Sequence, residues 1–202
     1  MANTDDQFSG VMVDFPSPET GGGKVKRGAD RYYPVIKKWQ KAVEVTQQFN
    51  GWSRLGDDCH GYFWATNNYM GWALKAIEAL DFRVISFLPW VKPGNAGIGQ
   101  YFRGCNEHLI FCVRGSGYAV KTASKNIRSD YLVGAPRPTD PVTGKRIHSA
   151  KPIRSYELVE ERTTGHYLEA FARPNKPLRD RWSLVGDEIM VDGEPAAAKS
   201  SK

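Results

Sequence analysis

The chain lacks several signals that would assign it to common protein classes. Its 202 residues include only three cysteines, Cys59, Cys105 and Cys112, and this odd number without a repeated spacing argues against a disulfide framework. No apolar run approaches the roughly 18 residues that span a bilayer. The N-terminus carries Asp5 and Asp6 and does not resemble a signal peptide. We therefore predict a protein of a reducing cytoplasm without a membrane segment.

Three common ligand-binding and catalytic motifs are also missing. Gly115 to Gly117 follow an apolar segment, but Val120 stands where a dinucleotide loop needs its third glycine. The chain has no Gly-Lys-Ser/Thr loop for a nucleoside triphosphate and no Gly-x-Ser-x-Gly elbow for a serine hydrolase. Cys105, His108 and Cys112 include no Cys-x-x-Cys pair, so we expect no zinc site.

The residues that are present suit one globular domain with a full core, because 41% of them are hydrophobic. A net charge of +6 favours a polyanionic partner, although a basic solvated surface is an equal alternative. Aromatic residues make up 12% of the chain, which is compatible with base stacking. We predict a flexible N-terminus over 1–8, a folded domain over 9–190 and a disordered tail over 191–202.

Apolar strands alternate with amphipathic helices along the domain. The pattern predicts strands over 9–14, 61–66, 84–91, 107–113, 130–133, 167–172 and 182–185. It predicts helices over 37–49, 67–80 and 152–161. Strands that alternate with helices indicate a three-layer α/β fold with a parallel-rich sheet.

The most informative stretch is Asp14-Phe15-Pro16-Ser17. Asp14 ends an apolar strand and stands just before a strand-breaking proline, so its carboxylate is expected at the sheet edge where α/β proteins bind ligands. A turn-capping role for Asp14 is the structural alternative. An exocyclic amine is a poor nucleophile, because its lone pair is delocalised into the ring. Acceptors facing its N–H groups help it attack a methyl sulfonium, so the stretch suggests amino-group methylation.

A glycine-rich basic loop follows this stretch directly. Three glycines at 21–23 precede its cations, and the loop is either solvated or faces the phosphates of a ligand. Its position beside a predicted site adds support to the second interpretation without excluding the first. We predict nucleic-acid contacts from Lys24, Lys26, Arg27, Tyr33 and Lys92.

Five segments, in order, resemble one protein family. They are 13–16 with 33–34, 63–67 with 80–82, 90–93 with 99–103, 106–108 and 113–115, 148–152 with 156–160, and 167–174 with 182 and 186–188. Together they resemble the adenine N6-methyltransferase family named for the 70-kilodalton subunit of the mRNA adenosine methyltransferase. The resemblance implies a Rossmann-like S-adenosylmethionine-dependent methyltransferase sheet with a permuted motif order. In that order the catalytic motif comes first and the cofactor elements lie toward the C-terminal end.

The same resemblance implies roles for individual residues. Asp14 and the backbone carbonyl of Phe15 would accept hydrogen bonds from the target amine, and Pro16 would set the chain direction. The implied cofactor contacts come from Asp14, Lys151, Glu169, Phe171, Arg173 and Asp187. Lys151 would contact the carboxylate of S-adenosylmethionine, and Glu169 would suit its ribose hydroxyls. Asp187 stands where the family usually has Asn, so in its ionised form it can accept a hydrogen bond but cannot donate one.

Some of these roles have structural alternatives, and the motif itself departs from the family pattern. Phe171 would also suit the core, and Lys151 would also suit solvent. Phe15 replaces the usual proline and Ser17 replaces the usual aromatic residue, which stacks on the flipped base for about 1–3 kcal/mol. Tyr33 and Trp90 are candidates to supply that face from elsewhere.

The expected activity is N6-adenine methylation of nucleic acid. DNA is favoured over RNA, because a short member without appended RNA-binding modules suggests a prokaryotic or phage-infected cell. A homodimer and a partner methyltransferase subunit are both open. The alternative hypothesis is a catalytically silent subunit that binds nucleic acid or supports an active partner.

Overall fold

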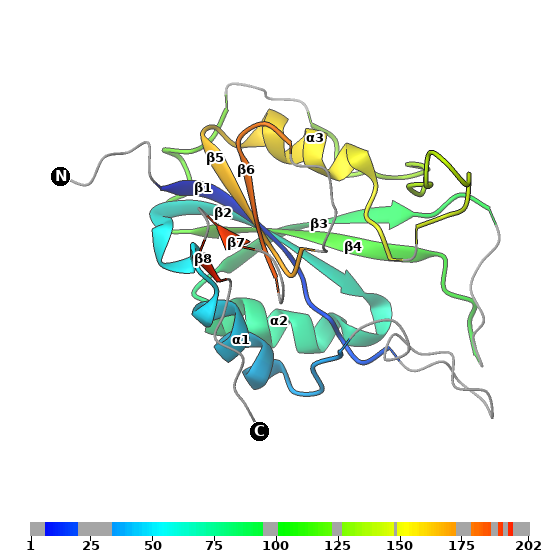
Figure 1. Cartoon of the computed structure of the whole chain (residues 1–202), viewed down its shortest axis with the longest axis horizontal. Coiled ribbons are helices and arrows are strands. Elements are labelled where there is room, and N and C mark those ends of the chain that lie inside the picture. The colour runs from blue at the N-terminus through cyan, green and yellow to red at the C-terminus, as the bar shows by residue number, and fades with distance from the viewer. Residues whose placement is uncertain are drawn as a thin grey trace.

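A six-stranded mixed sheet forms the middle of the protein, in the order β3-β4-β2-β1-β5-β6 (Figure 1). Its strands are β1 (Phe8–Asp14), β2 (Leu55–Thr66), β3 (Arg83–Val91), β4 (Asn106–Arg114), β5 (His166–Ala170) and β6 (Trp182–Val185). β1 runs parallel to β2 and β5, and β5 runs parallel to β6. β4 runs antiparallel to both β2 and β3. A second, two-stranded sheet pairs β7 (Met190–Val191) with β8 (Glu194–Pro195).

This computed structural model describes residues 7–19, 34–94, 101–122, 127–147, 149–172, 179–186, 190–191 and 194–195. Several predictions fall outside these residues. They concern most of the predicted N-terminal and C-terminal segments and the following predicted site residues: Lys24, Lys26, Arg27, Tyr33, Arg173 and Asp187.

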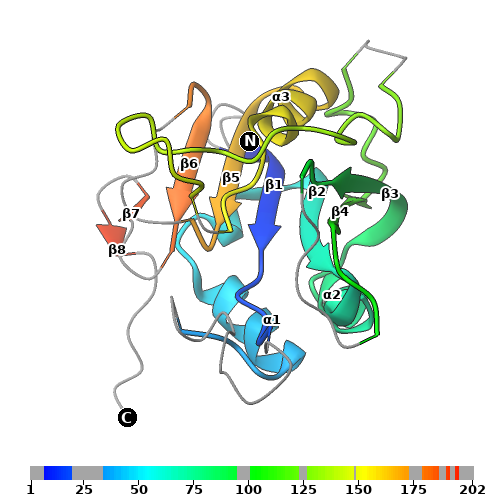
Figure 2. The ribbon, with the colours of Figure 1, turned by 90° about the vertical axis from the view of Figure 1, so that its right-hand side faces the viewer.

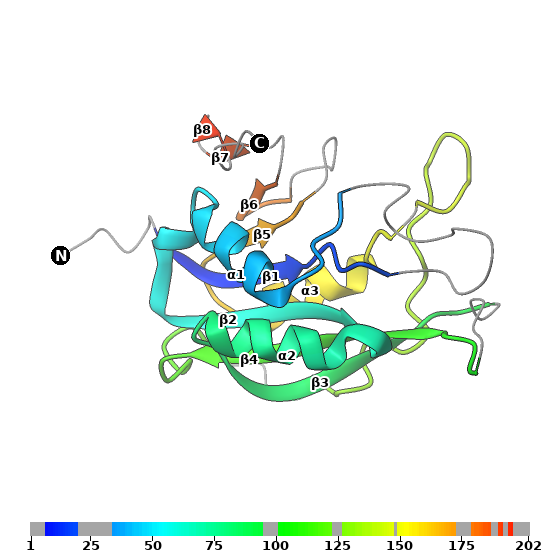
Figure 3. The same cartoon turned by 90° about the horizontal axis from the view of Figure 1, so that it is seen from below.

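Helices cover both faces of the sheet. α1 (Trp39–Gln48) and α2 (Met70–Ala79) lie on one face, and α3 (Ile153–Arg162) lies on the other (Figure 2). Seen from the α1 and α2 side, both helices lie in front of the sheet (Figure 3). A 3₁₀ turn, η4 (Asn67–Tyr69), joins β2 to α2, and another, η3 (Trp52–Arg54), precedes β2. The predicted three-layer Rossmann-like α/β fold is confirmed.

Alternation along the strands divides the core into two layers. Val11, Val13 and Phe63 pack toward α1 and α2, whereas Met12 and Tyr62 pack toward α3. Successive side chains of a strand point to opposite faces, so a central strand buried on both faces is apolar throughout. The same alternation puts Asp14, two residues after Met12, on the α3 face.

Most of the predicted elements agree with the structure to within a few residues, but the predicted strand over 130–133 is wrong. These residues form a turn in which the Val133 amide donates to the carbonyl of Asp130 at 2.9 Å. Gly134 follows with a φ of 74°, a conformation that suits glycine and ends the segment. β2 also begins earlier than predicted, at Leu55, because Asp57 and Asp58 interrupt its apolar pattern.

The order in which strands are added to the sheet reverses at β1, between β2 on one side and β5 on the other. From β1 the chain passes through α1 to β2 on one side, whereas β5 lies on the other side of β1 and follows α3. Ligands of open α/β sheets bind outside the carboxyl ends of the strands at such a switch point. Asp14 ends β1 there, and Val13 is paired with Ala170 at the end of β5. The fold therefore brings the end of β1, early in the chain, beside the end of β5, late in the chain.

Candidate active site

A buried lysine lies at the centre of the carboxyl edge. The Nζ of Lys151 lies 3.1 Å from Oδ2 of Asp14 and 2.8 Å from Oε2 of Glu107. The Lys151 side chain is only 9% exposed, whereas that of Asp14 is 35% exposed. Lys151 stands two residues before α3, so the start of that helix holds the ammonium over the end of β1. Asp14 is therefore the solvent-facing member of an ion cluster.

A second lysine completes this cluster. Lys92, just after β3, forms an ion pair with the other carboxylate oxygen of Glu107. Its ammonium also lies 4.9 Å from the centre of the Trp90 ring, and that of Lys151 lies 5.2 Å from the centre of Trp64. A cation over an indole face gains electrostatic stabilisation when water is excluded. We call Asp14, Lys92, Glu107 and Lys151 the charge cluster.

The charge cluster shifts the ionisation of its members. Burial alone would raise the pKa of Glu107, but the ammonium groups of Lys151 and Lys92 outweigh it and lower the pKa to about 2. Burial alone would lower the pKa of Lys151, but Asp14 and Glu107 hold that pKa above its usual value. All these shifts favour the charged forms, so the cluster keeps its ion pairs at neutral pH.

A buried carboxylate lies beside the charge cluster, one strand away. Glu169 of β5 is 8% exposed and accepts a hydrogen bond from the hydroxyl of Tyr156 at 3.0 Å. Glu169 is paired with Met12 of β1, so its side chain is on the same face as Asp14. Tyr156 comes from α3, so this helix orients Glu169 and also places Lys151 nearby.

Phe171 turns away from this carboxylate. Its φ of 60° is unusual for a bulky residue, which needs firm contacts to stay there. Its ring packs against Phe49 with centroids 4.8 Å apart and against Phe15 with centroids 5.9 Å apart. This packing suits the core role that the sequence left open for Phe171, and its contact with a cofactor stays a prediction.

The backbone after Asp14 folds into two tight turns. The Ser17 amide donates to the carbonyl of Phe15 at 2.7 Å, and the Glu19 amide donates to the carbonyl of Ser17 at 2.8 Å. Each is a γ-turn, in which the amide of residue i+2 donates to the carbonyl of residue i. Pro16 is the central residue of the first turn, and Pro18 is that of the second. A carbonyl has two acceptor sites, so that of Phe15 can accept one more hydrogen bond.

The Phe15 side chain belongs to the core. It is 6% exposed and packs against Phe63 and Trp72. This burial explains how a phenylalanine can occupy a position where the family motif has proline. The backbone carbonyl stays at the edge while the ring fills the layer beneath α2.

A small hollow, open to solvent, lies at this edge. Its lining comprises Asp14, Phe15, Ser17, Trp64, Ala65, Thr66, Tyr69, Trp72, Ala73, Glu107 and Lys151. Trp64, Glu107 and Lys151 come from the α3 face, whereas Tyr69 and Trp72 come from the α2 side. The pocket therefore wraps over the ends of β1 and β2.

The structure brings together part of the predicted site. Asp14 and Lys151 form an ion pair, Phe15 lines the same pocket, and Glu169 lies on the same face of the sheet. Lys92 is bound in the charge cluster, and its contact with nucleic acid stays a prediction. Trp90 is 2% exposed and donates its indole N–H to the carbonyl of Ala135, so it offers no free face for a base.

The sequence interpretation assigned no role to Glu107, Tyr69 or Trp72. Glu107 had a usable signal, because it is a carboxylate at the start of an apolar strand, within one of the five family-like segments. Tyr69 and Trp72 had no such signal, because their spacing is that of an ordinary amphipathic helix. Only the position of α2 beside the end of β1 shows that they line the pocket.

One family model matches this chain. It is described as MT-A70 and covers residues 51–188, which is more than half of the sequence. The match includes Glu107, Lys151 and Glu169, and it begins after Asp14. Among curated proteins, the comparison finds no significant match.

Proposed function

The chain belongs to the MT-A70 family of S-adenosylmethionine-dependent methyltransferases, and on that premise we propose that it methylates N6 of adenine in nucleic acid. We propose DNA as the preferred substrate and RNA as the second. The observation that carries the proposal is the position of Asp14. It is a half-buried carboxylate at the switch point of the sheet, in a pocket with a buried lysine and four aromatic residues.

The residues at this edge suit the cofactor chemically. S-adenosylmethionine has a carboxylate, an ammonium and ribose hydroxyls, and it supplies a methyl group made electrophilic by its sulfonium. Lys151 is the cation that would bind the carboxylate, and Glu169 is the acceptor that would bind the ribose hydroxyls. We also propose Asp14, Phe171, Arg173 and Asp187 as cofactor contacts. Because Tyr156 already fixes Glu169, this acceptor would need little reorganisation on binding.

Catalysis would depend on the position of the amine. Asp14 and the free acceptor site of the Phe15 carbonyl would each accept one N–H of the exocyclic amine. These contacts direct the nitrogen lone pair out of the ring plane and toward the methyl group, and they hold the amine in line for attack. The product amine loses a proton, and the Asp14 carboxylate, which is 35% exposed, can pass it to solvent. In a duplex, the adenine must first leave the base stack.

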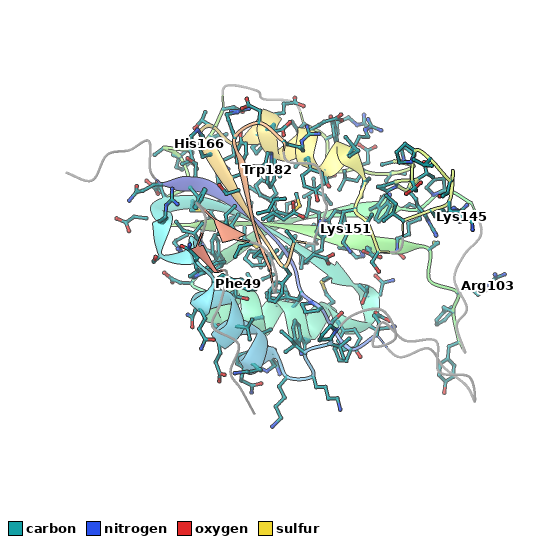
Figure 4. The ribbon with its side chains drawn as sticks, in the orientation of Figure 1. Phe49, Arg103, Lys145, Lys151, His166 and Trp182 are labelled. Atoms are coloured by element: carbon teal, nitrogen blue, oxygen red, sulfur yellow. The ribbon has the colours of Figure 1, made fainter. Side chains whose placement is uncertain are left out.

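Basic side chains on the same side of the molecule as Lys151 support a polyanionic substrate. Lys145 and Arg103 lie on the same side of the molecule as Lys151, away from His166 at the start of β5 (Figure 4). Arg103 comes four residues before Glu107, so the segment that carries it leads directly into the charge cluster. Phosphate contacts of this kind hold the register of a nucleic acid and do not select its sequence.

A catalytically silent subunit is the second candidate, and the ion pair of Asp14 favours it. Asp14 is paired with Lys151, so the amine and the cofactor carboxylate would each have to compete for one partner of that pair. The family match also begins after Asp14 and does not include the altered motif. In such a subunit, Asp14 would serve to neutralise Lys151.

The two candidates differ in one measurement. The purified protein is incubated with methyl-labelled S-adenosylmethionine and single-stranded and duplex DNA and RNA pools. The proposed enzyme labels adenine, and Asp14→Asn lowers the rate by about 100-fold, because it removes a charged acceptor from a positioned amine. Asp180→Asn, an exposed change outside the pocket, leaves the rate unchanged.

Cofactor binding, measured by calorimetry, separates the remaining outcomes. Binding without transfer to any pool supports the silent subunit. The absence of binding would overturn both the enzyme proposal and the contacts assigned to Lys151 and Glu169. A full rate in Asp14→Asn would overturn the proposed role of Asp14 alone.

A further inference from the structure

Two aromatic side chains, which we call the aromatic wall, line the pocket together with Asp14. Tyr69 ends η4 and Trp72 lies in the first turn of α2, and both line the pocket with Asp14 and Ser17. Both aromatic side chains are half-buried, whereas the aromatic side chains of the neighbouring strand β2 are buried. A ring that borders a pocket and retains exposure has surface available to a ligand.

Three contacts fix this wall to the segment after Asp14. The hydroxyl of Tyr69 donates to the carbonyl of Pro18 at 2.6 Å. The Phe15 ring meets that of Trp72 edge-on, with centroids 5.3 Å apart and planes at 76°. The hydroxyl of Thr66 donates to the Glu19 carboxylate. Because η4, α2 and residues 15–19 are joined in this way, the aromatic wall keeps a set position relative to Asp14.

Two tryptophans that line the pocket also have an enclosed indole N–H. The indole N–H groups of Trp64 and Trp72 are buried, and neither has a hydrogen-bond partner among the residues that the structure describes. Trp64 is itself only 2% exposed. Buried donors are nearly always satisfied in proteins, and leaving one unpaired costs about 1–3 kcal/mol. A planar ring would cover the exposed aromatic faces, whereas these enclosed N–H groups lie in the indole planes and are not reached by a stacked ring.

We propose that Tyr69 and Trp72 stack on the target adenine and hold it beside Asp14. The inference rests on the proposed function, because it takes adenine as the base. Ser17, a small residue, lines the same pocket. The burial of Phe15 is part of the same arrangement, since its ring supports Trp72 from the core. The stacking face thus comes from the start of α2 instead of from the segment after Asp14.

The stacking role is tested by binding, separately from methyl transfer. The probes are two single-stranded DNA oligonucleotides with a fluorescent label, identical except that one carries adenines and the other carries abasic sites at the same positions. Fluorescence anisotropy gives the affinity for each, in the presence of S-adenosylmethionine. Wild type should prefer the adenine probe by at least about 10-fold, the lower part of the range for base–aromatic stacking.

Paired variants separate the aromatic face from general packing. Trp72→Leu should reduce this preference to about 3-fold or less, and Trp72→Phe should largely restore it, because a ring face returns. Tyr69→Leu should lower the preference, whereas Tyr69→Phe, which keeps the ring, should not. Tyr118→Leu, an exposed aromatic outside the pocket, is the matched control. Circular dichroism and thermal unfolding identify any variant that fails to fold. If the Trp72 variants do not fold, the comparison of Tyr69→Leu with Tyr69→Phe tests the stacking role.

Each result has a distinct meaning. An unchanged preference for adenine in folded Trp72→Leu and Tyr69→Leu would overturn the inference, as would equal binding of both probes by wild type. A preference that depends on Trp72 in a protein without methyl transfer would uphold the stacking role and reject the proposed activity. Transfer to adenine with a KM that does not respond to either Leu variant would uphold the activity and reject the stacking role.

Discussion

The two ends of β2 hold two polar clusters of opposite character. At the carboxyl end, the charge cluster lies beside a pocket with unpartnered indole donors. Toward the other end, His60 forms a neutral network with Tyr62, Thr163 and the backbone of Gly117. Both clusters lie on the α3 face of the same sheet. Their different charge therefore comes from their side chains and not from the face of the sheet on which they lie.

The His60 network is closed. The carbonyl of Gly117 can only accept, so Nε2 of His60 must donate to it, at 2.9 Å. Nδ1 of His60 then accepts from the Thr163 hydroxyl at 2.7 Å, and that hydroxyl accepts from Tyr62, also at 2.7 Å. The carbonyl of Thr163 accepts from the hydroxyl of Tyr167. In its neutral form, His60 therefore has both ring nitrogens satisfied.

The comparison separates stability from function. A buried polar network with every member satisfied makes the fold rigid and specific, and it leaves no group for a ligand. The pocket at the opposite end keeps a half-buried carboxylate and indole donors that have no partner among the described residues, which a folded protein retains at a cost in stability. Changes in the His60 network should therefore affect unfolding alone, whereas changes in the pocket should affect binding and transfer as well.

The largest expected effect on stability comes from Glu107. Glu107→Gln keeps the shape of the side chain but leaves two lysines without their shared carboxylate, so we expect the free energy of unfolding to fall by about 3 kcal/mol. Urea unfolding monitored by tryptophan fluorescence measures this change. Glu44→Gln, which breaks the exposed pair with Lys41, should change it by less than about 0.5 kcal/mol. Similar losses in the two variants would contradict the view that the charge cluster is an integrated unit.

A smaller effect follows from the pH dependence of His60. Burial, with some help from the nearby charges of Arg162 and Lys121, lowers the pKa of His60 to about 4, against about 6.5 in an unfolded chain. Between these values the unfolded state binds a proton that the folded state does not. Stability is therefore full above pH 6.5 and falls as the pH drops, by about 2 kcal/mol at pH 5.

Urea titrations between pH 8 and pH 5 measure this slope in wild type and in His60→Gln. Glutamine can still donate to the carbonyl of Gly117 but does not titrate, so the slope of the variant should be shallower over this range. Parallel slopes in the two proteins would show that other groups cause the pH dependence. Glu107, with its pKa near 2, contributes little above pH 5.

The smallest expected effect concerns Thr163. Thr163→Val removes the hydroxyl that links Tyr62 to His60 and leaves Nδ1 without a donor, so unfolding should become easier by about 1–2 kcal/mol. Methyl transfer per folded molecule should not change, because Thr163 lies at the end of α3 away from Lys151. A loss of transfer at full folding would contradict the separation of the two ends of β2.

Much of the fold could be predicted because its signals are local. The apolar run of β1, the helix periodicity of 67–80 and the proline before α3 each involve neighbouring residues. The turn at 130–133 was mistaken for a strand because Tyr131, Leu132 and Val133 suit a strand in isolation. Leu132 is indeed buried, and it is the hydrogen bond of the turn, together with Gly134, that excludes the strand.

The candidate site was predictable only in part. A carboxylate before a proline at a strand end identified Asp14, and the family resemblance pointed to Lys151 and Glu169. That Glu107 would join Lys151 to Lys92 depends on the pairing of β4 with β2 and β3. Such register is set by long-range packing, which no local pattern specifies.

The sequence by itself determined the α/β alternation, the family and the carboxylate at the end of β1. Tertiary structure alone decided the surroundings of that carboxylate: a lysine 137 positions later in the chain and an aromatic wall from α2. The physical reason is that strand ends meet at a common edge whatever their separation in the chain. The charges and rings gathered there depend on register and helix position, which the whole core sets.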